Sequence, residues 1–433
     1  MPPHRPRSYA LPIFVIGFLV GMTALRVMDA VSTGAWNREA RLLLRVREMV
    51  SESFVDELEP EQITDRALKG LVQSLDDYSN FYTGEEIDRL NRETTGLYRG
   101  IGVLFRRPPS EGQILFALAD SPAHRAGLHP GDRFVRVAGR EVDGLEPGEL
   151  QDLLRDPDGE EVDVELESLD GELRSVVLRP EPVVDPSVRH GSIVDAEAGI
   201  AYVAISSFSQ KTPREFFAEA DYLEGQGMRS LVLDLRGNPG GVLDSAIELA
   251  NAFIASGVLL TTRSREETEV YEAQPDKARL QDLPLVVLVD GDSASASEVF
   301  VGAVQDYRVG AVIGESTYGK GVVQSLTRFG EDRGVLKMTS SRYYTPSGRR
   351  IDRGSEGVGG IAPDVLVEVP DPERDEVRLY LSGYSAPHDS REQLHEWELR
   401  IGESLVTPRP TDSALRAALD LLRDRPLRGH ESG

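Results

Sequence analysis

Between about residues 199 and 370 the sequence alternates short apolar runs with amphipathic stretches, and this alternation restricts the fold more than any other feature. Runs such as GIAYVAISSF, SLVLDLRG and LPLVVLVD are rich in β-branched residues and predict buried strands. VLDSAIELANAFI and SEVFVGAVQDY carry apolar residues at helical spacing and predict helices. Strands that alternate with helices predict an α/β core.

Composition excludes several classes of function. The chain has 433 residues, 40% of them apolar, which is enough for two or three domains with their own cores. A net charge of −25 argues against nucleic acid as the main partner, because its phosphates would be repelled. The chain has no cysteine, which excludes a thiol nucleophile, a disulfide framework and a thiolate zinc site.

The N-terminus predicts a membrane segment. Residues 9–25 are apolar and follow His4, Arg5 and Arg7, a pattern that places the N-terminus inside and the rest outside the cytoplasm. We expect an uncleaved, single-pass anchor in the inner membrane within residues 1–28; a cleaved signal peptide is the alternative. The remaining chain would then be periplasmic or otherwise extracytoplasmic.

The rest of the chain divides into four regions by its patterns. Residues 36–95 have helical spacing and residues 97–182 predict a separate small β-module, in which GIGVLF reads as one strand. Residues 183–370 contain the α/β core. Residues 371–433 are charged and helical, and the sequence assigns them no function.

The stretch GESTYGKG, residues 314–321, begins like a phosphate-binding loop. Gly321 stands where such a loop needs Ser or Thr, and the residues that follow predict strands rather than a helix. A nucleotide site is therefore disfavoured. Only five lysines occur in the chain, so Lys320 within a glycine loop suggests that an amine able to lose its proton was needed there.

Two further loops follow predicted strands, where α/β proteins place their sites. They are RGNPGGVL, residues 236–243, and DGDSASASEVF, residues 290–300. A serine at a strand-to-helix turn can expose its hydroxyl, while Gly240 and Gly241 permit close approach of a second backbone, so that an oxyanion hole could form. Taken alone, SASAS reads as a helix cap, RGNPGG as a turn and Lys320 as a solvated lysine. What favours a site is that the three stretches lie within one predicted α/β unit.

A serine nucleophile needs a base, and no histidine lies between His190 and His388. Lys320 is the simpler candidate, because a neutral amine can accept the serine proton. A solvated lysine has a pKa of about 10.4, so burial would have to lower the pKa of this amine. His190 is the first alternative base.

The sequence resembles the carboxyl-terminal processing proteases, the tail-specific family of serine peptidases, from about residue 36 to 370. The matching stretches are long and in family order: LDDYSNFYTGEE, YRGIGV, DSPAHRAGLHPGDRFVRVAGREV, VLDLRGNPGG, DGDSASASEVFVGAVQDYRVGAVIGESTYGKGVVQ and LKMTSSRYYTPSGRRI. The chain departs from the family at Asp77 and Tyr78, where Pro-His is usual; this does not affect the catalytic machinery.

The resemblance implies a crotonase-like α/β protease core of ββα units at 183–370, with a PDZ domain inserted at 97–182. It implies a serine endopeptidase that cleaves extracytoplasmic proteins near their C-termini, with the PDZ domain recognising substrate tails and gating activity. The residues that it implies for catalysis are the nucleophile Ser295, the base Lys320 and the orienting residue Gln324, with backbone donors at Gly241 and Ala296 and support from Gly240, Glu298 and Thr317. The residues that it implies for tail binding are Gly100, Ile101, Gly102 and Val103.

The implied partners are protein substrates bound through their C-termini, without metal, cofactor or nucleic acid. The sequence leaves open an activating adaptor protein and a homo-oligomer. Two other functions compete with this reading: a membrane-anchored, non-catalytic PDZ adaptor, and an acyl-CoA enzyme, which a crotonase-like core alone would permit.

Overall fold

The computed structural model describes residues 38–106, 112–145, 147–154, 161–330, 333–353 and 359–424. The expected membrane anchor within residues 1–28 lies outside the described residues. Within the described ranges, no helix combines the length and apolar character needed to cross a membrane. The chain divides into two compact units, Met1–Thr83 with Thr327–Met338, and Gly84–Leu326 with Thr339–Gly433.

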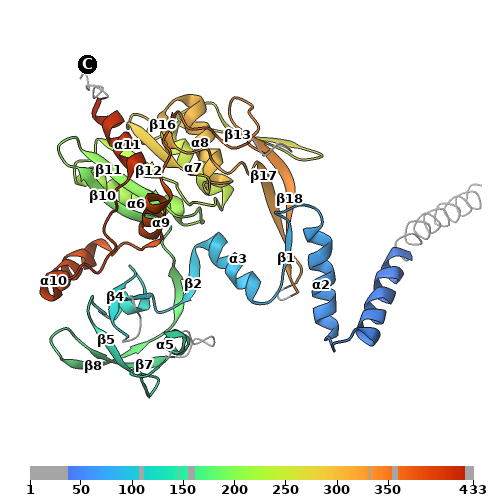
Figure 1. Ribbon diagram of the computed structural model, residues 1–433, viewed down its shortest axis with the longest axis horizontal. Coiled ribbons are helices and arrows are strands. Elements are labelled where there is room, and N and C mark those ends of the chain that lie inside the picture. Colours follow the sequence, from blue (N-terminus) through green and yellow to red (C-terminus); the bar gives the residue numbers. More distant parts are fainter. Residues whose placement is uncertain are drawn as a thin grey trace, which may run out of the picture. The chain divides into compact units, whose positions relative to one another are not determined.

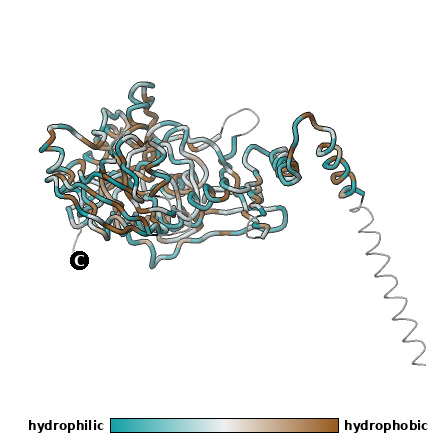
Figure 2. Tube along the Cα trace, turned by 90° about the horizontal axis from the view of Figure 1, so that it is seen from below, coloured by the Kyte–Doolittle hydropathy of each residue, from teal (hydrophilic) through white to brown (hydrophobic). Residues whose placement is uncertain are grey.

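The first unit contains helices and one short antiparallel pair of strands. Residues 38–53 are helical, and α2 spans Pro60–Gln73. Strand β1 (Asn80–Tyr82) pairs with the start of β18 (Val335–Tyr344). Hydrophobic and hydrophilic segments lie side by side on these helices (Figure 2). Several large hydrophobic side chains between residues 42 and 55 are exposed.

Helix α3 (Glu85–Thr95) leads into a small β-module with its own core. The first turn of α3 is acidic, which favours the positive end of the helix dipole, and the helix ends at Gly96 with a φ of 67°. The elements of the module are β2 (Leu97–Gly100), β3 (Val103–Phe105), β4 (Ile114–Ala117), α4 (Pro122–Arg125), β5 (Arg133–Val137), β6 (Arg140–Glu141), α5 (Pro147–Leu153), β7 (Val162–Glu167), β8 (Leu173–Leu178) and β9 (Glu181–Val184).

The single strand predicted for GIGVLF is wrong in one respect, because it is interrupted between β2 and β3. The carbonyl of Ile101 accepts a hydrogen bond from the Ala123 N–H at 2.9 Å, and that of Gly102 accepts one from the Leu118 N–H at 2.8 Å. Gly102 has a φ of 78°, a conformation that glycine adopts without steric cost. The chain therefore turns at these two residues instead of continuing the ladder.

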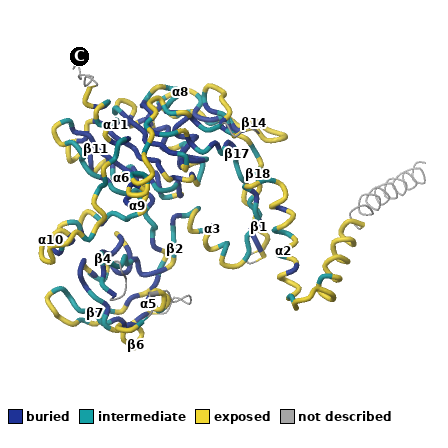
Figure 3. The backbone as a smooth tube through the Cα atoms, viewed as in Figure 1, coloured by how far each residue is buried: buried dark blue, intermediate teal, exposed yellow. Residues whose placement is uncertain are grey.

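A six-stranded sheet forms the core of the second unit (Figure 1). Its strand order is β10-β11-β12-β15-β16-β19, with β10 antiparallel to β11 and the other neighbours parallel. The strands are β10 (Val188–Asp195), β11 (Ile200–Ile205), β12 (Ser230–Asp234), β15 (Leu285–Val289), β16 (Gly310–Gly314) and β19 (Val365–Leu366). The four central strands are almost fully buried (Figure 3), which confirms the strands predicted from continuous apolar runs.

Helices cover both faces of this sheet. One face packs against α6 (Thr212–Gly225), α7 (Leu243–Phe253) and α8 (Ala296–Tyr307). The other face packs against α11 (Ser413–Asp424), a helix of the C-terminal extension. Since successive residues of a strand point to opposite faces, residues of one strand contribute to both layers.

The remaining elements flank this layered core. Strand β18 also pairs with β13 (Val258–Arg263) and β17 (Val322–Arg328), and β13 pairs with β14 (Thr268–Glu272). Strands β17 and β18 confirm that strands follow the lysine loop. The other elements are the short helix η1 (Pro275–Lys277) and, in the C-terminal extension, α9 (Asp371–Ser382), η2 (His388–Ser390) and α10 (Arg391–Ile401). The crotonase-like arrangement of ββα units stays a prediction.

Candidate active site

Three loops leave the same edge of the main sheet. Strands β12, β15 and β16 are neighbours and run parallel, so the segments that follow them begin side by side. These segments are residues 235–242, 290–295 and 315–321. The first contains RGNPGG, the second ends at the middle serine of SASAS, and the third contains STYGKG. The sheet thus brings together the three stretches that the sequence singled out.

Of the serines in SASAS, only Ser295 is accessible. Ser293 and Ser297 are fully buried. The Ser293 hydroxyl donates to the carbonyl oxygen of Leu235 at 2.8 Å, and that of Ser297 donates to the carbonyl oxygen of Asn238 at 3.1 Å. Ser295 is partly exposed at the start of α8. Burial therefore favours the same serine as the family resemblance.

Ser295 also has an unusual backbone conformation. Its φ is 57° and its ψ is −115°, a region that residues with a side chain rarely adopt. Such a conformation costs about 1–3 kcal/mol and persists only where surrounding contacts impose it. A strained turn between a strand and a helix is a known way to present a nucleophilic hydroxyl.

The carboxylate of Glu298 imposes much of this geometry. It is fully buried and accepts hydrogen bonds from the loop of the serine and the loop of the lysine. Oε2 accepts from the backbone N–H groups of Ser295 and Lys320, both at 2.8 Å. Oε1 accepts from the Gly319 N–H at 2.7 Å and the Thr317 hydroxyl at 2.6 Å. One side chain therefore holds the backbones of both predicted dyad residues.

The ionised form of Glu298 fits these contacts. Burial raises the pKa of Glu298, and its four donors oppose this by stabilising the charge. The Thr317 oxygen itself accepts from the Ile361 N–H at 2.7 Å, so the Thr317 proton is directed at Glu298. With four donors facing it, the carboxyl group has no acceptor to which a proton of its own could point.

Gly240 lies against the serine loop. A Cβ at this position would come within 2.6 Å of the Ala294 carbonyl oxygen and 2.8 Å of the Ser295 Cβ. Its φ of 94° is a second reason for glycine. The loops approach each other closely only because this residue has no side chain.

The two predicted oxyanion donors are placed at this contact. Gly241 forms a parallel β-bridge with Phe208. The Phe208 N–H donates to the Gly240 carbonyl oxygen, and the Val242 N–H donates to the Phe208 carbonyl oxygen. In a parallel bridge of this kind the N–H of Gly241 itself points away from Phe208. Ala296 is the first residue of α8, so its N–H is among the donors that a helix start leaves without an intrahelical partner.

Two buried polar residues that the sequence reasoning missed connect the loops. The Asn238 side chain holds its own loop, since it donates to the Ile205 carbonyl oxygen at 2.8 Å and accepts from the Gly240 N–H at 2.9 Å. Its backbone carbonyl accepts from the Ala294 N–H of the serine loop at 3.0 Å. Asp290 accepts from the Gly237 N–H at 2.9 Å and the Ser293 N–H at 3.1 Å. Burial raises the pKa of Asp290. Both residues could have been found from their positions in the sequence, because Asn238 lies within RGNPGG and Asp290 directly follows a buried strand.

Lys320 is partly exposed, and its carbonyl accepts a hydrogen bond from the Tyr343 hydroxyl. The following residue is glycine for a steric reason, since a Cβ on Gly321 would lie 2.2 Å from Asp352 Oδ1. Gln324 lies on β17, and its amide donates to the Val322 carbonyl oxygen at 3.5 Å. The catalytic roles of Lys320 and Gln324 stay predictions.

The predicted tail-binding residues line a cavity of about 380 Å³ that Arg92, Asp185 and Tyr384 from outside the β-module also line. Gly100, Ile101, Gly102 and Val103 form one side of it. Apolar residues, among them Leu118 and Leu154, line other parts. A cavity with both apolar and polar lining residues beside irregular backbone suits a peptide terminus, and the tail-binding role itself stays a prediction.

The alternative base, His190, lies on β10 and stacks on Tyr380 of α9, with ring centroids 4.1 Å apart. Burial lowers the pKa of His190 to about 4.

Within the part of the chain that the structure describes, no group of three or more Asp, Glu, His or Cys residues could hold a metal ion.

Comparison with known proteins gives two family matches and full-length relatives. Residues 199–367 match peptidase family S41, and residues 117–168 match the PDZ domain. A carboxy-terminal-processing protease of Bartonella bacilliformis is 30% identical over 425 residues, covering 95% of each chain. The chain belongs to peptidase family S41. It is therefore a serine-type peptidase of the carboxy-terminal-processing group, with an S41 fold and a PDZ domain.

Other relatives agree with this assignment. Carboxy-terminal processing protease CtpA of Bacillus subtilis is 30% identical over 378 residues, covering 84% of this chain and 77% of the relative. Among solved structures, a photosystem II D1 C-terminal processing protease is 26% identical, covers 80% of this chain and 98% of its own, and has a TM-score of 0.43. The family assignment rests on the sequence relatives.

Proposed function

We propose that this S41 peptidase is an endopeptidase that cleaves proteins near their C-termini with a Ser295–Lys320 dyad. The observation that carries the proposal is the shared Glu298 carboxylate, which binds the backbone N–H of both residues at 2.8 Å. Ser295 is moreover the only accessible serine of its loop. A membrane-anchored, non-catalytic PDZ adaptor is not favoured, because both dyad residues are present in a chain of the peptidase family.

The chemistry follows from these positions. The neutral Lys320 amine accepts the Ser295 hydroxyl proton while Oγ attacks the scissile carbonyl carbon. The N–H groups of Gly241 and Ala296 receive the negative charge that develops on the carbonyl oxygen. The Lys320 ammonium then protonates the leaving amine. Water hydrolyses the acyl-enzyme by the same proton transfers in reverse, with Gln324 orienting the amine throughout.

Substitution of the serines tests the nucleophile. Ser295→Ala removes one partly exposed hydroxyl, so the protein should stay folded and lose peptidase activity by roughly 10³-fold or more. Ser293→Ala removes the buried hydrogen bonds of its hydroxyl with Leu235 and Asp290, and Ser297→Ala removes the one to Asn238. Both should lose stability, by about 1–3 kcal/mol for each group left without its partner, and should keep measurable activity. If Ser293→Ala were the inactive variant and Ser295→Ala an active one, the nucleophile would be misassigned.

We also propose that the catalytic part works outside the cytoplasm and that the PDZ domain gates activity through substrate tails. The apolar run at residues 9–25, preceded by basic residues, supports the location. A phosphatase that functions only outside the cytoplasm, fused after residue 60, should be active. Activity of a cytoplasmic reporter alone at that position would contradict the topology.

A further inference from the structure

The C-terminal extension covers one face of the catalytic sheet. Ala414, Leu415, Ala418 and Leu422 of α11 are buried against residues of β11, β12, β15 and β16. Asp412 lies just before this helix and also accepts from the Leu415 N–H at 3.0 Å. Docking of α11 therefore places a carboxylate at the end of β12.

Asp412 binds Arg236 in a two-point ion pair. Arg236 Nη1 donates to Oδ1 at 2.9 Å, and Nη2 donates to Oδ2 at 2.6 Å. The side chains are only 5% and 6% exposed, so the pair is shielded from water. The other side of the Arg236 guanidinium binds Asp234, with Nε to Oδ1 at 3.0 Å. The Tyr202 hydroxyl donates to Asp234 Oδ2 at 2.7 Å.

These contacts settle the charges of the group. Burial opposes the charge on Arg236, but Asp234 and Asp412 raise the pKa of Arg236 well above the ordinary value. Burial likewise disfavours the Asp412 carboxylate, and Arg236 nevertheless holds the pKa of Asp412 below its usual range. Arg236 would stay paired with Asp234 if Asp412 were lost, but its Nη1 group would lose its carboxylate acceptor, and a buried donor left without a partner is costly.

Arg236 lies near the start of residues 235–242, the segment that carries Gly240 and Gly241 and is called the oxyanion loop below. The Gly237 N–H binds Asp290 at 2.9 Å, and the Asn238 carbonyl oxygen accepts from the Ala294 N–H at 3.0 Å. Gly240 follows, with its backbone against Ser295. A short path of direct contacts thus runs from Asp412 to the N–H of Gly241 and to the serine loop.

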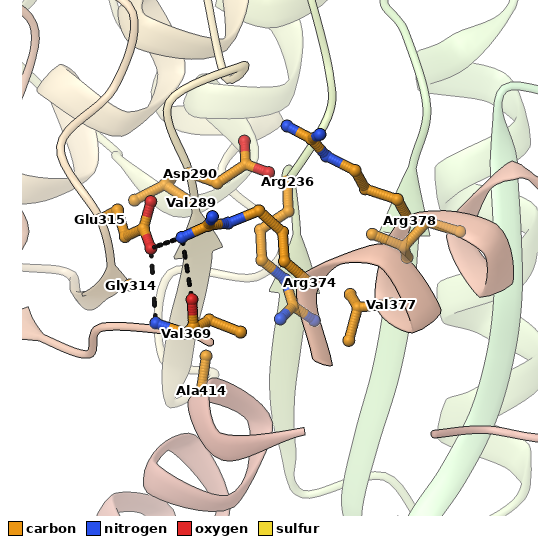
Figure 4. Close-up of a pocket in the computed structure, with 11 residues that line it drawn as sticks. Arg236, Val289, Asp290, Gly314, Glu315, Val369, Arg374, Val377, Arg378 and Ala414 are labelled. Carbon is orange, nitrogen blue, oxygen red and sulfur yellow. Dashed lines mark hydrogen bonds and ion pairs between the residues drawn. The ribbon is translucent and has the colours of Figure 1, made fainter. Parts of the chain in front are cut away.

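The other two catalytic loops also meet this extension. Arg378 of α9 pairs with Asp292 of the serine loop, and Arg374 of α9 pairs with Glu315 at 2.6 Å, before the lysine loop (Figure 4). These side chains are about 30–50% exposed, and exposed ion pairs contribute little. The buried pair of Asp412 with Arg236 is therefore the contact on which positioning depends.

We propose that Asp412 is a positioning residue for catalysis, which acts through Arg236 to hold the oxyanion loop against Ser295. The C-terminal extension is then part of the catalytic apparatus. This inference rests on the proposed Ser295 site.

The test compares Asp412→Asn with Asp420→Asn in the full-length protein. Asp420 lies on the same α11 helix, but it is 63% exposed and pairs only with Arg423 three residues away. With a fluorogenic peptide, Asp412→Asn should lower kcat at least tenfold while KM stays within about twofold. Asp420→Asn should leave both close to the wild-type values. Ser295→Ala, assayed in parallel, tests the site itself.

A second measurement separates positioning from folding. A peptide aldehyde of the substrate sequence forms a tetrahedral adduct whose oxyanion needs the Gly241 N–H, whereas the matching peptide amide does not. Asp412→Asn should weaken the aldehyde at least tenfold and leave the amide unchanged. If Asp412 only stabilised the fold, its substitution would lower the melting temperature and leave the ratio of aldehyde affinity to amide affinity unchanged.

The outcomes are distinct. If Asp412→Asn does not fold, Asp412→Glu, which keeps the charge but is longer by one methylene, should show the same loss of kcat and of aldehyde affinity. Unchanged kcat and aldehyde affinity in a folded Asp412 variant would overturn the proposal. Activity in Ser295→Ala would instead overturn the proposed function, whatever the Asp412 variants do.

Discussion

At the scale of single residues, the site depends on which polar groups are buried. Glu298 is fully buried, while Ser295 and Lys320, whose backbones it binds, are partly exposed. The residues proposed to react can thus reach a substrate, and the residue that binds both of their backbones is shielded from it. The backbone strain at Ser295 is held in place by the same contacts.

Glu298 predicts the acid side of the pH profile. Because burial raises the pKa of Glu298, protonation begins above the value of about 4.3 for an exposed glutamate. A protonated carboxyl cannot accept from all four donors, so kcat/KM should fall as the pH drops through this pKa. Glu298→Gln should lose about 100-fold in kcat at neutral pH and show a shallower acid decline, because only protonation of the proposed base Lys320 then contributes to it.

Stability should respond to Glu298 in the opposite direction. The pKa of Glu298 is higher in the folded than in the unfolded protein, so folding favours the neutral carboxyl. The resulting stabilisation of the folded protein is fully present below the unfolded-state pKa and is lost as the pH rises through the folded-state pKa. Melting temperature and kcat/KM, measured between pH 4 and about 7, would separate the two effects. An acid decline that persists unchanged in Glu298→Gln would assign it to another group.

Lys320 predicts the pH at which the rise of activity ends. A general base acts only as the free amine, so kcat/KM should rise with pH and level off well below the pKa of about 10.4 of a solvated lysine. Lys320→Arg should be as inactive as Lys320→Ala, because arginine stays protonated. Loss of the base should cost about 10²–10⁴-fold, read from initial rates with a fluorogenic peptide. Substantial activity in Lys320→Arg would exclude the lysine from this role.

At the scale of elements, three neighbouring parallel strands determine the site. Each of β12, β15 and β16 ends where a loop of the candidate site begins. The loops differ in what holds them. The Asn238 carbonyl and the Asp290 carboxylate connect the oxyanion and serine loops. Glu298 connects the serine and lysine loops. A change that separates two loops should therefore impair catalysis without unfolding the sheet.

The glycines of the oxyanion loop test this. Gly240→Ala places a Cβ within 2.8 Å of the Ser295 Cβ and should lower kcat roughly 10²–10³-fold by displacing the oxyanion donors. Gly237→Ala is the matched control, since Gly237 also has a positive φ, of 68°, but a Cβ there meets no atom within 4 Å. Both variants should stay folded. Equal kcat values for the two would show that the close approach at Gly240 does not matter.

The elements show what sequence can and cannot predict. Strands β11, β12 and β15 were readable because strands buried on both faces have continuous apolar sequences. The break between β2 and β3 was not readable, because it depends on carbonyl groups that bind Ala123 and Leu118 elsewhere in the module. The partner of Arg236 was equally hidden: Asp412 is 176 positions away in a segment that carries no catalytic signal.

At the scale of the whole molecule, a peptidase core is combined with a PDZ domain that has its own hydrophobic core. The cavity lined by Gly100–Val103 predicts that substrates are selected through a free C-terminal carboxylate and an apolar last residue. Amidation of a peptide substrate should weaken its binding, measured by fluorescence anisotropy on Ser295→Ala protein. Equal affinity for the acid and the amide would indicate another mode of recognition.

The most direct test of the central claim is to locate the covalent intermediate. A peptide ester is mixed with the enzyme, the reaction is quenched in acid within the first turnovers, and the acylated residue is identified by mass spectrometry of proteolytic fragments. We predict an acyl group on Ser295 in the wild type, none in Ser295→Ala, and a strongly reduced amount in Lys320→Arg. An acyl group on any other residue, or unchanged acylation in Lys320→Arg, would contradict a Ser295–Lys320 dyad.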